Sequence, residues 1–116
     1  MLFATLKTAN NEYRGRLSAK RCVELEKALG KNPLRVFTDL NGTQMPSMSD
    51  LMTILHYSLV DYEHSVNEYE VFDDFCEAEG DIGKLIEYLL EVFRVSGLIP
   101  AKAEEEEAEK KSKRKN

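Results

Sequence analysis

The chain has 116 residues, of which 42% are hydrophobic and 32% are charged, which suits one domain with a modest core. The net charge of -5 and the pI of about 5.1 argue against unassisted nucleic-acid binding, because a phosphate backbone needs a concentrated basic face. No apolar run approaches the roughly 20 residues of a membrane span, and the N-terminal residues lack the basic and apolar regions expected of a signal peptide. We therefore expect a cytoplasmic protein without membrane contact. Its two cysteines, Cys22 and Cys76, are then expected to be buried free thiols rather than a disulfide.

Residues 2–17 predict a β-hairpin with a two-residue turn at Asn10-Asn11, since Asn tolerates the positive φ that such turns require. This turn would bring most of the apolar side chains to one face of the hairpin. The expected pairs are Leu6 with Gly15, Ala4 with Leu17 and Thr8 with Tyr13 on that face, and Lys7 with Arg14 and Thr5 with Arg16 on the other. An isolated hairpin is marginally stable, so it must dock on the helices or pair with another chain.

Five helices are predicted to follow, over about 18–29, 32–41, 47–63, 67–79 and 81–96. Residues that suit N-caps precede the first four, and glycines or Asn-Gly follow the helices as stop signals. The caps are Ser18, Asn32, Ser47 and Asn67, and the stops are Gly30, Asn41-Gly42, Gly80 and Gly97. The spacing predicts a mainly α fold: a small helical bundle preceded by the hairpin, in a single domain over residues 1–100.

The stretch 47–63 is predicted to be the central helix. Its apolar residues recur at helical spacing on one side, and Met48 and Met52 widen that stripe. The stripe comprises Leu51, Ile54, Leu55, Ser58, Leu59 and Tyr62. A helix this apolar cannot stand alone in water, so we expect the other segments to pack on it.

Each of the other helices has an apolar side that we expect to be buried. These sides are Cys22, Val23, Leu25, Ala28 and Leu29 in the first helix; Leu34, Phe37 and Leu40 in the second; Val71, Phe72, Phe75 and Cys76 in the fourth; and Ile82, Leu85, Ile86, Leu89, Val92 and Phe93 in the fifth.

Residues 101–116 differ in character from the rest of the chain. They contain no large apolar residue, and a run of Glu is followed by a run of Lys and Arg. Nothing in this composition can attach the segment to a core, so it is predicted to be a disordered charged tail.

The sequence contains few signs of catalysis or metal binding. His56 and His64 lie eight residues apart without a third nearby ligand, which favours exposed or capping histidines over a metal site. The acidic cluster of Asp73, Asp74, Glu77 and Glu79 fits no EF-hand loop and is best interpreted as a solvated face. We predict no catalytic, cofactor-binding or metal-binding residue, and no enzyme activity.

The remaining candidates for function are large apolar side chains that fall outside the main stripes. Methionine and aromatic residues suit adaptable binding surfaces, but they are also ordinary core residues, and both interpretations stay open. The candidates are Phe3, Met45, Met48, Tyr57, Tyr69 and Tyr88.

Residues 2–99 resemble the tail assembly chaperones of long-tailed phages and prophages of Gram-positive bacteria. The resemblance rests on the hairpin entering Arg16–Leu34, then Met45–Leu59, then an acidic helix followed by Gly80–Ile99. Its most specific part is the string LEKALGKNPL at Leu25–Leu34. It implies no catalytic motif.

The resemblance implies a role in tail morphogenesis. Such chaperones bind the tape measure protein, a long apolar helical protein, keep it soluble, recruit tail tube protein around it and are absent from the mature virion. The location would be the host bacterial cytoplasm. A client helix would lie in a groove beside the central helix, with Met48, Met52 and Tyr57 as the expected contact residues. The open hairpin edges also allow a homo-oligomer.

The alternative interpretation is a small acidic regulator or inhibitor that captures a basic protein through its acidic helix. Ionic strength separates the two functions. An electrostatic regulator should lose its partner steeply as salt rises, whereas a groove that binds an apolar client should not.

Overall fold

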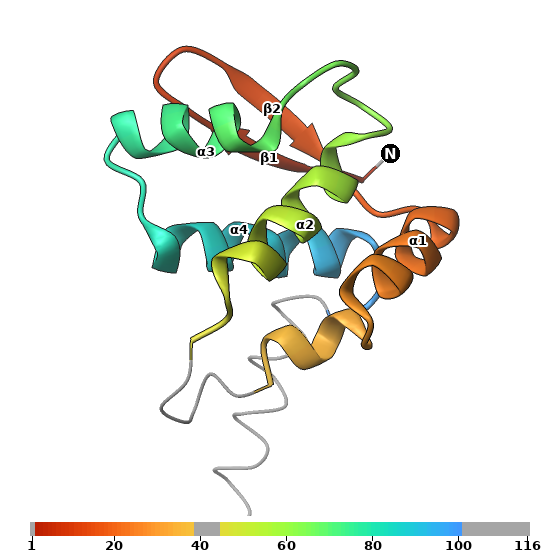
Figure 1. Ribbon diagram of the computed structural model, residues 1–116. Helices are drawn as coiled ribbons and strands as arrows, with labels where there is room; N and C mark the ends of the chain where they lie inside the picture. The colour runs from red at the N-terminus through yellow and green to blue at the C-terminus, as the bar shows by residue number, and fades with distance from the viewer. Residues whose placement is uncertain (1, 39–44, 101–116) are drawn as a thin grey trace, which may run out of the picture.

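Residues 2–38 and 45–100, which the computed structural model describes, form a β-hairpin followed by four α-helices and one short 3-10 helix (Figure 1). The elements are β1 (Ala4–Lys7), β2 (Glu12–Gly15), α1 (Ala19–Leu29), η1 (Pro33–Val36), α2 (Met48–Leu59), α3 (Glu68–Glu77) and α4 (Ile82–Val95). The mainly helical fold with an N-terminal hairpin is confirmed. The predicted tail, residues 101–116, lies outside the described residues.

Four side chains determine where the α-helices begin. Ser18, Ser47, Asn67 and Asp81 each accept a hydrogen bond from a backbone N–H in the first turn of the following helix. Such bonds satisfy donors that have no partner within the helix. The helix starts expected at Ser18, Ser47 and Asn67 are therefore confirmed.

The expectation of five α-helices is wrong by one. Asn32 does act as a cap, but the segment after it forms only the 3-10 turn η1, with Pro33 at its first position. The predicted end of this helix, residues 39–41, lies outside the described residues. A 3-10 turn is the usual form of so short a helical piece, because its hydrogen-bond geometry is poorer than that of an α-helix.

The hairpin turn lies one residue earlier than expected. Thr8 N–H donates to the Asn11 carbonyl at 2.9 Å, so the turn residues are Ala9 and Asn10. The observed pairs are Ala4 with Gly15, Thr5 with Arg14, Leu6 with Tyr13 and Lys7 with Glu12. Each pairing thus differs from the prediction by two residues, which leaves the same side chains on the apolar face.

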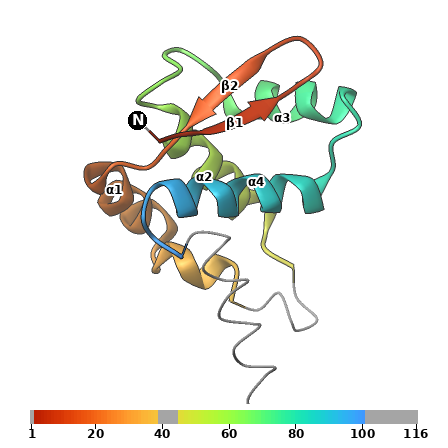
Figure 2. The same ribbon diagram turned by 180° about the vertical axis from the view of Figure 1, so that it is seen from behind.

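Helix α2 is the centre of the described chain, as predicted. It packs against α1, α3, α4 and β2, while β1 packs on α4. Figures 1 and 2 show the hairpin and α3 above α4, with α1 on the opposite side of α2 from α3. The residues of α2 with the smallest exposed fractions are Leu51, Ile54, Leu55 and Ser58.

Several expected core residues are less buried than predicted. Val23 is 55% exposed, and Ala28 and Cys76 are also exposed. Each lies at the border of its apolar stripe, where helical spacing alone does not decide which side of the border faces the core. The half-buried members of the predicted sides are Cys22, Leu29, Leu34, Phe72 and Ile82.

Candidate binding groove between α2 and α3

A hollow of about 470 Å³ lies between α2 and α3, and we refer to it as the α2–α3 groove. Most of its lining is apolar, and the residues come from both helices. They are Met48, Ser49 and Met52 from α2, and Tyr69, Phe72 and Asp73 from α3. The groove thus combines methionine and aromatic side chains, which adapt well to apolar partners.

Helical spacing explains why these side chains meet. Met48 and Met52 are four residues apart, and Tyr69 and Phe72 are three apart, so each pair forms one face of its helix. Met52 is only 5% exposed and forms part of the base, whereas Met48 and Tyr69 are 45% and 60% exposed. Met48 and Tyr69 therefore remain available to a partner.

Two polar contacts hold α3 in place beside the groove. His56 Nδ1 on α2 lies 3.1 Å from Glu68 Oε2 at the start of α3. Asp74, in the middle of α3, accepts hydrogen bonds from the hairpin turn: the Thr8 hydroxyl, and the Asn10 side-chain amide and backbone N–H, the last at 3.0 Å. These contacts, with α2 on one side and the hairpin on the other, fix the position of α3, which forms one wall of the groove.

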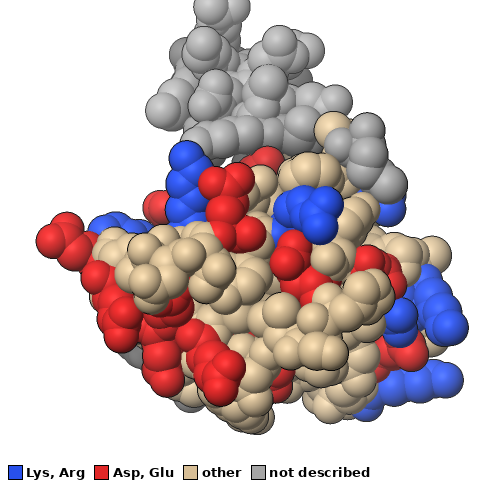
Figure 3. Space-filling view, turned by 90° about the horizontal axis from the view of Figure 1, so that it is seen from above, with Lys and Arg blue, Asp and Glu red and all other residues tan. Residues whose placement is uncertain are grey.

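The two helices that form the groove carry charges of almost one sign. Neither α2 nor α3 contains a lysine or arginine. Among the described residues, Asp50 pairs with Lys31 at 2.8 Å, Glu68 with His56, and Asp74 with the hairpin turn. Figure 3 shows acidic side chains gathered on the side where α3 lies, whereas toward α1 lysines and arginines lie among acidic side chains.

Three carboxylates of α3 have no ion pair or side-chain hydrogen bond within the described residues: Glu70, Asp73 and Glu77. Their spacing of three and four residues places them in one stripe along the helix. Asp73 also lines the groove, so the stripe meets the α3 edge of the groove there, with Glu70 and Glu77 about one turn to either side.

The structure brings together two of the three predicted contact residues. Met48 and Met52 both line the groove, but Tyr57 does not. Tyr57 is nine residues after Met48, about two and a half helical turns, so it lies on the opposite side of α2. It is half-buried there, with its ring 5.0 Å from that of His56.

The other large apolar candidates are distributed over the molecule. Tyr69 joins the groove, whereas Tyr88 is 92% buried (8% exposed) in the core, where burial and, secondarily, Glu63 raise the pKa of its phenol. Phe3 lies on the hairpin, 5.7 Å from the ring of Tyr62. Only Tyr69 of these three can take part in binding at the groove.

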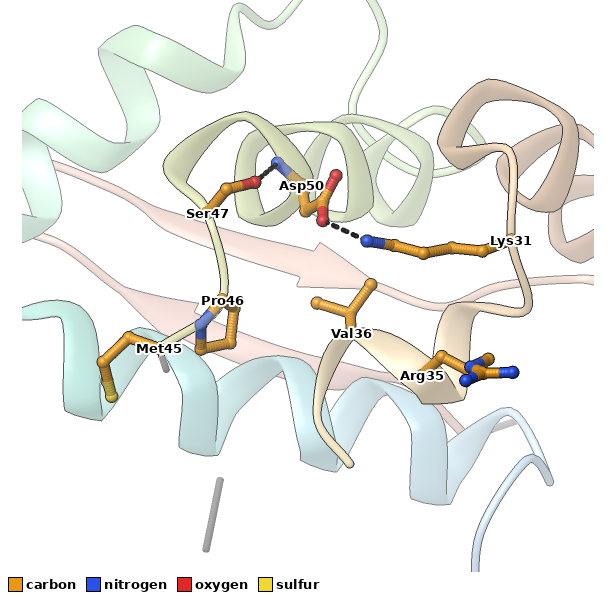
Figure 4. A pocket seen from close by; sticks show the side chains of 7 residues that line it. All are labelled: Lys31, Arg35, Val36, Met45, Pro46, Ser47 and Asp50. Atoms are coloured by element: carbon orange, nitrogen blue, oxygen red, sulfur yellow. Dashed lines mark hydrogen bonds and ion pairs between the residues drawn. The ribbon is translucent and has the colours of Figure 1, made fainter. Parts of the chain in front are cut away.

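Met45, the remaining candidate, lines a separate pocket of about 310 Å³ between η1 and the start of α2 (Figure 4). This pocket is mainly polar. The ion pair between Lys31 and Asp50 crosses it, and Ser47 accepts a hydrogen bond from the Asp50 N–H. Because these polar groups already satisfy one another, the pocket is a weaker candidate than the groove for binding an apolar partner.

Sequence reasoning missed Phe72 and Asp73 as groove residues, because Phe72 was expected in the core and Asp73 on a solvated face. The signal that identifies them is their spacing from Tyr69: three and four residues, on the same face of α3. The absence of Lys and Arg from both helices is a second signal visible in the sequence.

Within residues 2–38 and 45–100, no group of three or more His, Cys, Asp or Glu side chains is arranged to hold a metal ion. His56 and His64 do line one small pocket, together with Glu63. Both cysteines are free, and burial raises the pKa of the Cys22 thiol. In the same part of the chain, no helix combines the length and the hydropathy of a membrane span.

Comparisons with protein-family models, with curated proteins and with solved structures find no match to this chain.

Proposed function

We propose that this protein is a phage tail assembly chaperone that binds an apolar helical client, the tape measure protein, in the α2–α3 groove. The proposal combines the resemblance of residues 2–99 with the character of the groove. The observation that carries it is the pair of exposed side chains Met48 and Tyr69 above a base formed by Met52 and Phe72.

Binding in this groove would follow the general chemistry of helix-in-groove recognition. An amphipathic helix buries its apolar face against such a surface, and each square ångström removed from water contributes about 25 cal/mol. The flexible methionines can adjust to successive turns of a long client. The acidic surface on the α3 side of the groove keeps the complex soluble by repulsion between molecules.

In this role the chaperone shields apolar segments of the client until tail tube protein assembles around them. The chaperone is then released and does not enter the mature virion. A groove open along one side suits this cycle, because a bound helix can leave without unfolding its carrier.

The unpaired carboxylates Glu70, Asp73 and Glu77 favour a second candidate function, a small acidic regulator that captures a basic protein. The two functions differ in their response to salt. Capture by surface charge weakens steeply between low and high ionic strength, whereas burial of apolar surface does not.

Co-expression with the protein encoded immediately downstream tests the chaperone function. A long helical protein that is insoluble alone should become soluble and co-purify with this chain. The double variant Met48→Ser/Tyr69→Ser should lose that effect while its far-UV circular dichroism is unchanged. Met45→Ser, which removes a methionine that is 63% exposed outside the groove, is the matched control.

An unrelated downstream protein, or one that stays insoluble with the wild-type chain, would overturn the chaperone proposal. Met52 is unsuitable for this test, because its side chain is part of the core and its loss would destabilise the fold.

A further inference from the structure

The two edges of the α2–α3 groove differ in charge. Asp73 lines the α3 edge, and Glu70 and Glu77 lie about one turn to either side of it in the same stripe; none of these three carboxylates has a partner in the described part of the chain. The α2 edge is neutral, because Ser49 lines the groove there. One turn further along α2, the hydroxyl of Thr53 donates a hydrogen bond to the Ser49 carbonyl at 2.8 Å.

From this asymmetry we infer that the groove binds an amphipathic helix whose apolar stripe is bordered on one side by lysine or arginine. The inference deepens the proposed function, on which it rests, by specifying the chemistry of the client segment. Charge complementarity argues for it: an acidic flank would face three carboxylates, and a neutral flank would leave them without a counter-charge.

The dimensions agree with such a partner. The first and last of the three carboxylates are seven positions apart on α3, about two helical turns or 10 Å. Basic side chains at positions i, i+4 and i+7 of a bound helix cover the same length. Long lysine and arginine side chains can lay their methylene groups against Tyr69 while their charged ends reach the carboxylates.

The one-sided charge also sets the direction of the bound helix. With an apolar stripe alone, a bound helix could run in either direction along the groove. With basic residues on one flank, only the placement that puts them against α3 is favoured, so the client segment binds in a single orientation.

Three synthetic helical peptides with one apolar stripe and Lys, Gln or Glu on the same flank test the inference. Their affinities for the full chain are measured by fluorescence anisotropy at low salt. The Lys peptide should bind about tenfold more tightly than the Gln peptide, and the Glu peptide most weakly, since exposed ion pairs each contribute modestly. Raising the salt concentration should bring the Lys peptide to the affinity of the Gln peptide without abolishing binding.

Variants of the protein assign the effect to the acidic stripe. Asp73→Asn/Glu77→Gln should remove most of the preference for Lys and leave the affinity for the Gln peptide unchanged. Glu12→Gln/Glu87→Gln, which neutralises two exposed carboxylates outside α2 and α3, should keep the preference and so controls for net charge. Met48→Ser/Tyr69→Ser should weaken all three peptides.

Equal affinities for the three peptides would overturn the inference and leave the groove as a binding site. A preference that survives Asp73→Asn/Glu77→Gln would also overturn it, because another surface would then select the charge. If the Lys peptide binds selectively but co-expression fails to solubilise the downstream protein, the proposed function fails and the chemistry assigned to the groove stands.

Discussion

Gly15, at the end of β2, lies in close contact with Tyr88 of α4. A Cβ atom at this position would lie 2.3 Å from the hydroxyl oxygen of Tyr88, far inside van der Waals contact. The Tyr88 hydroxyl is buried and has no hydrogen-bond partner among the described residues. A buried polar group in this state destabilises the fold, so both residues offer a test of how the hairpin docks.

Gly15→Ala should lower the free energy of unfolding by about 1–3 kcal/mol, because the added methyl group overpacks the contact. Tyr88→Phe should raise that free energy by about 1 kcal/mol, since it removes the unpaired hydroxyl. In the double variant the cost of Gly15→Ala should largely disappear, because the next nearest side-chain atoms, Ser58 Oγ and the ring carbon Cζ of residue 88, are at 3.4 Å. Urea denaturation of the four proteins measures the coupling, and strict additivity would contradict the contact.

Glu79 has a φ of 65°, in the left-handed region that glycine adopts without strain. It follows the end of α3, where Glu79 N–H donates to the Cys76 carbonyl and Gly80 N–H to the Phe75 carbonyl. This is the hydrogen-bond pattern of a Schellman motif with Glu79 in the position that usually holds glycine. The motif at the end of α4 has Gly97 there, with a φ of 82°.

Glu79→Gly should therefore stabilise the protein by up to about 1 kcal/mol, and Gly97→Ala should destabilise it by a similar amount. A Cβ at Gly97 meets no atom within 4 Å, so its substitution tests backbone conformation alone. Thermal unfolding of the two variants measures both effects. A melting temperature lowered by Glu79→Gly would mean that the Glu79 side chain has a stabilising role that outweighs the strain.

At the scale of elements, the contact between α3 and the hairpin turn explains why the register was mispredicted. Local sequence favoured Asn10-Asn11 as the turn, but Asp74 accepts hydrogen bonds from Thr8 and Asn10, and Ala9 N–H donates to the Asp74 carbonyl at 3.1 Å. These partners are more than 60 positions apart in the sequence, so no local pattern reveals them. The position of the turn is therefore set by the residues that can form hydrogen bonds with α3.

The pH dependence of folding should report this contact. The hydrogen bond from the Thr8 hydroxyl, followed by those from Asn10, lowers the pKa of Asp74 below its ordinary value of 3.8. A carboxylate with a lowered folded-state pKa contributes stability that is present above the unfolded-state pKa and is lost as pH falls through the folded-state pKa. Asp74→Ala should reduce the melting temperature at pH 7 and flatten its decline below pH about 4.

The neighbouring variant Asp73→Asn is the control, since that carboxylate makes no hydrogen bond to the hairpin within the described residues. Melting curves by circular dichroism between pH 7 and pH 2.5 make the comparison. Identical pH profiles for wild type and Asp74→Ala would show that Asp74 does not fasten the hairpin to α3.

Helix positions were predictable from the sequence because their signals are local. Ser18, Ser47 and Asn67 are caps that act within one turn, and Gly30 and Gly97 adopt the positive φ that ends a helix. The length and type of η1 were not predictable, because a 3-10 turn and a short α-helix share the same starting signals.

The groove was predictable only in part. Met48 stood out as a large side chain at the border of its stripe, but helical spacing does not show which neighbour faces a given border. The position of α3 beside Met48 depends on tertiary contacts, and these brought Tyr69 to the groove while Tyr57 lies on the far side of α2. Knowledge of one helix face therefore predicts a site only when the partner helix is known.

For the whole molecule, acidic charge is concentrated on one side. The net charge is -5, and acidic side chains predominate on the α3 side, whereas lysines and arginines lie among acidic side chains toward α1 (Figure 3). The exposed side chains of Met48 and Tyr69 lie next to the acidic side. Repulsion between like-charged surfaces thus opposes contact between the apolar grooves of two molecules.

This arrangement predicts that self-association increases as the pH approaches the pI of about 5.1, because the repulsion disappears while the groove remains. Asp74 should still be ionised at that pH, since its pKa is lowered, so its hydrogen bonds from the hairpin are kept. Light scattering as a function of pH should rise near pH 5 for the wild-type chain and rise much less for Met48→Ser/Tyr69→Ser. Met45→Ser should behave like wild type, and an equal rise in all three would place the self-association outside the groove.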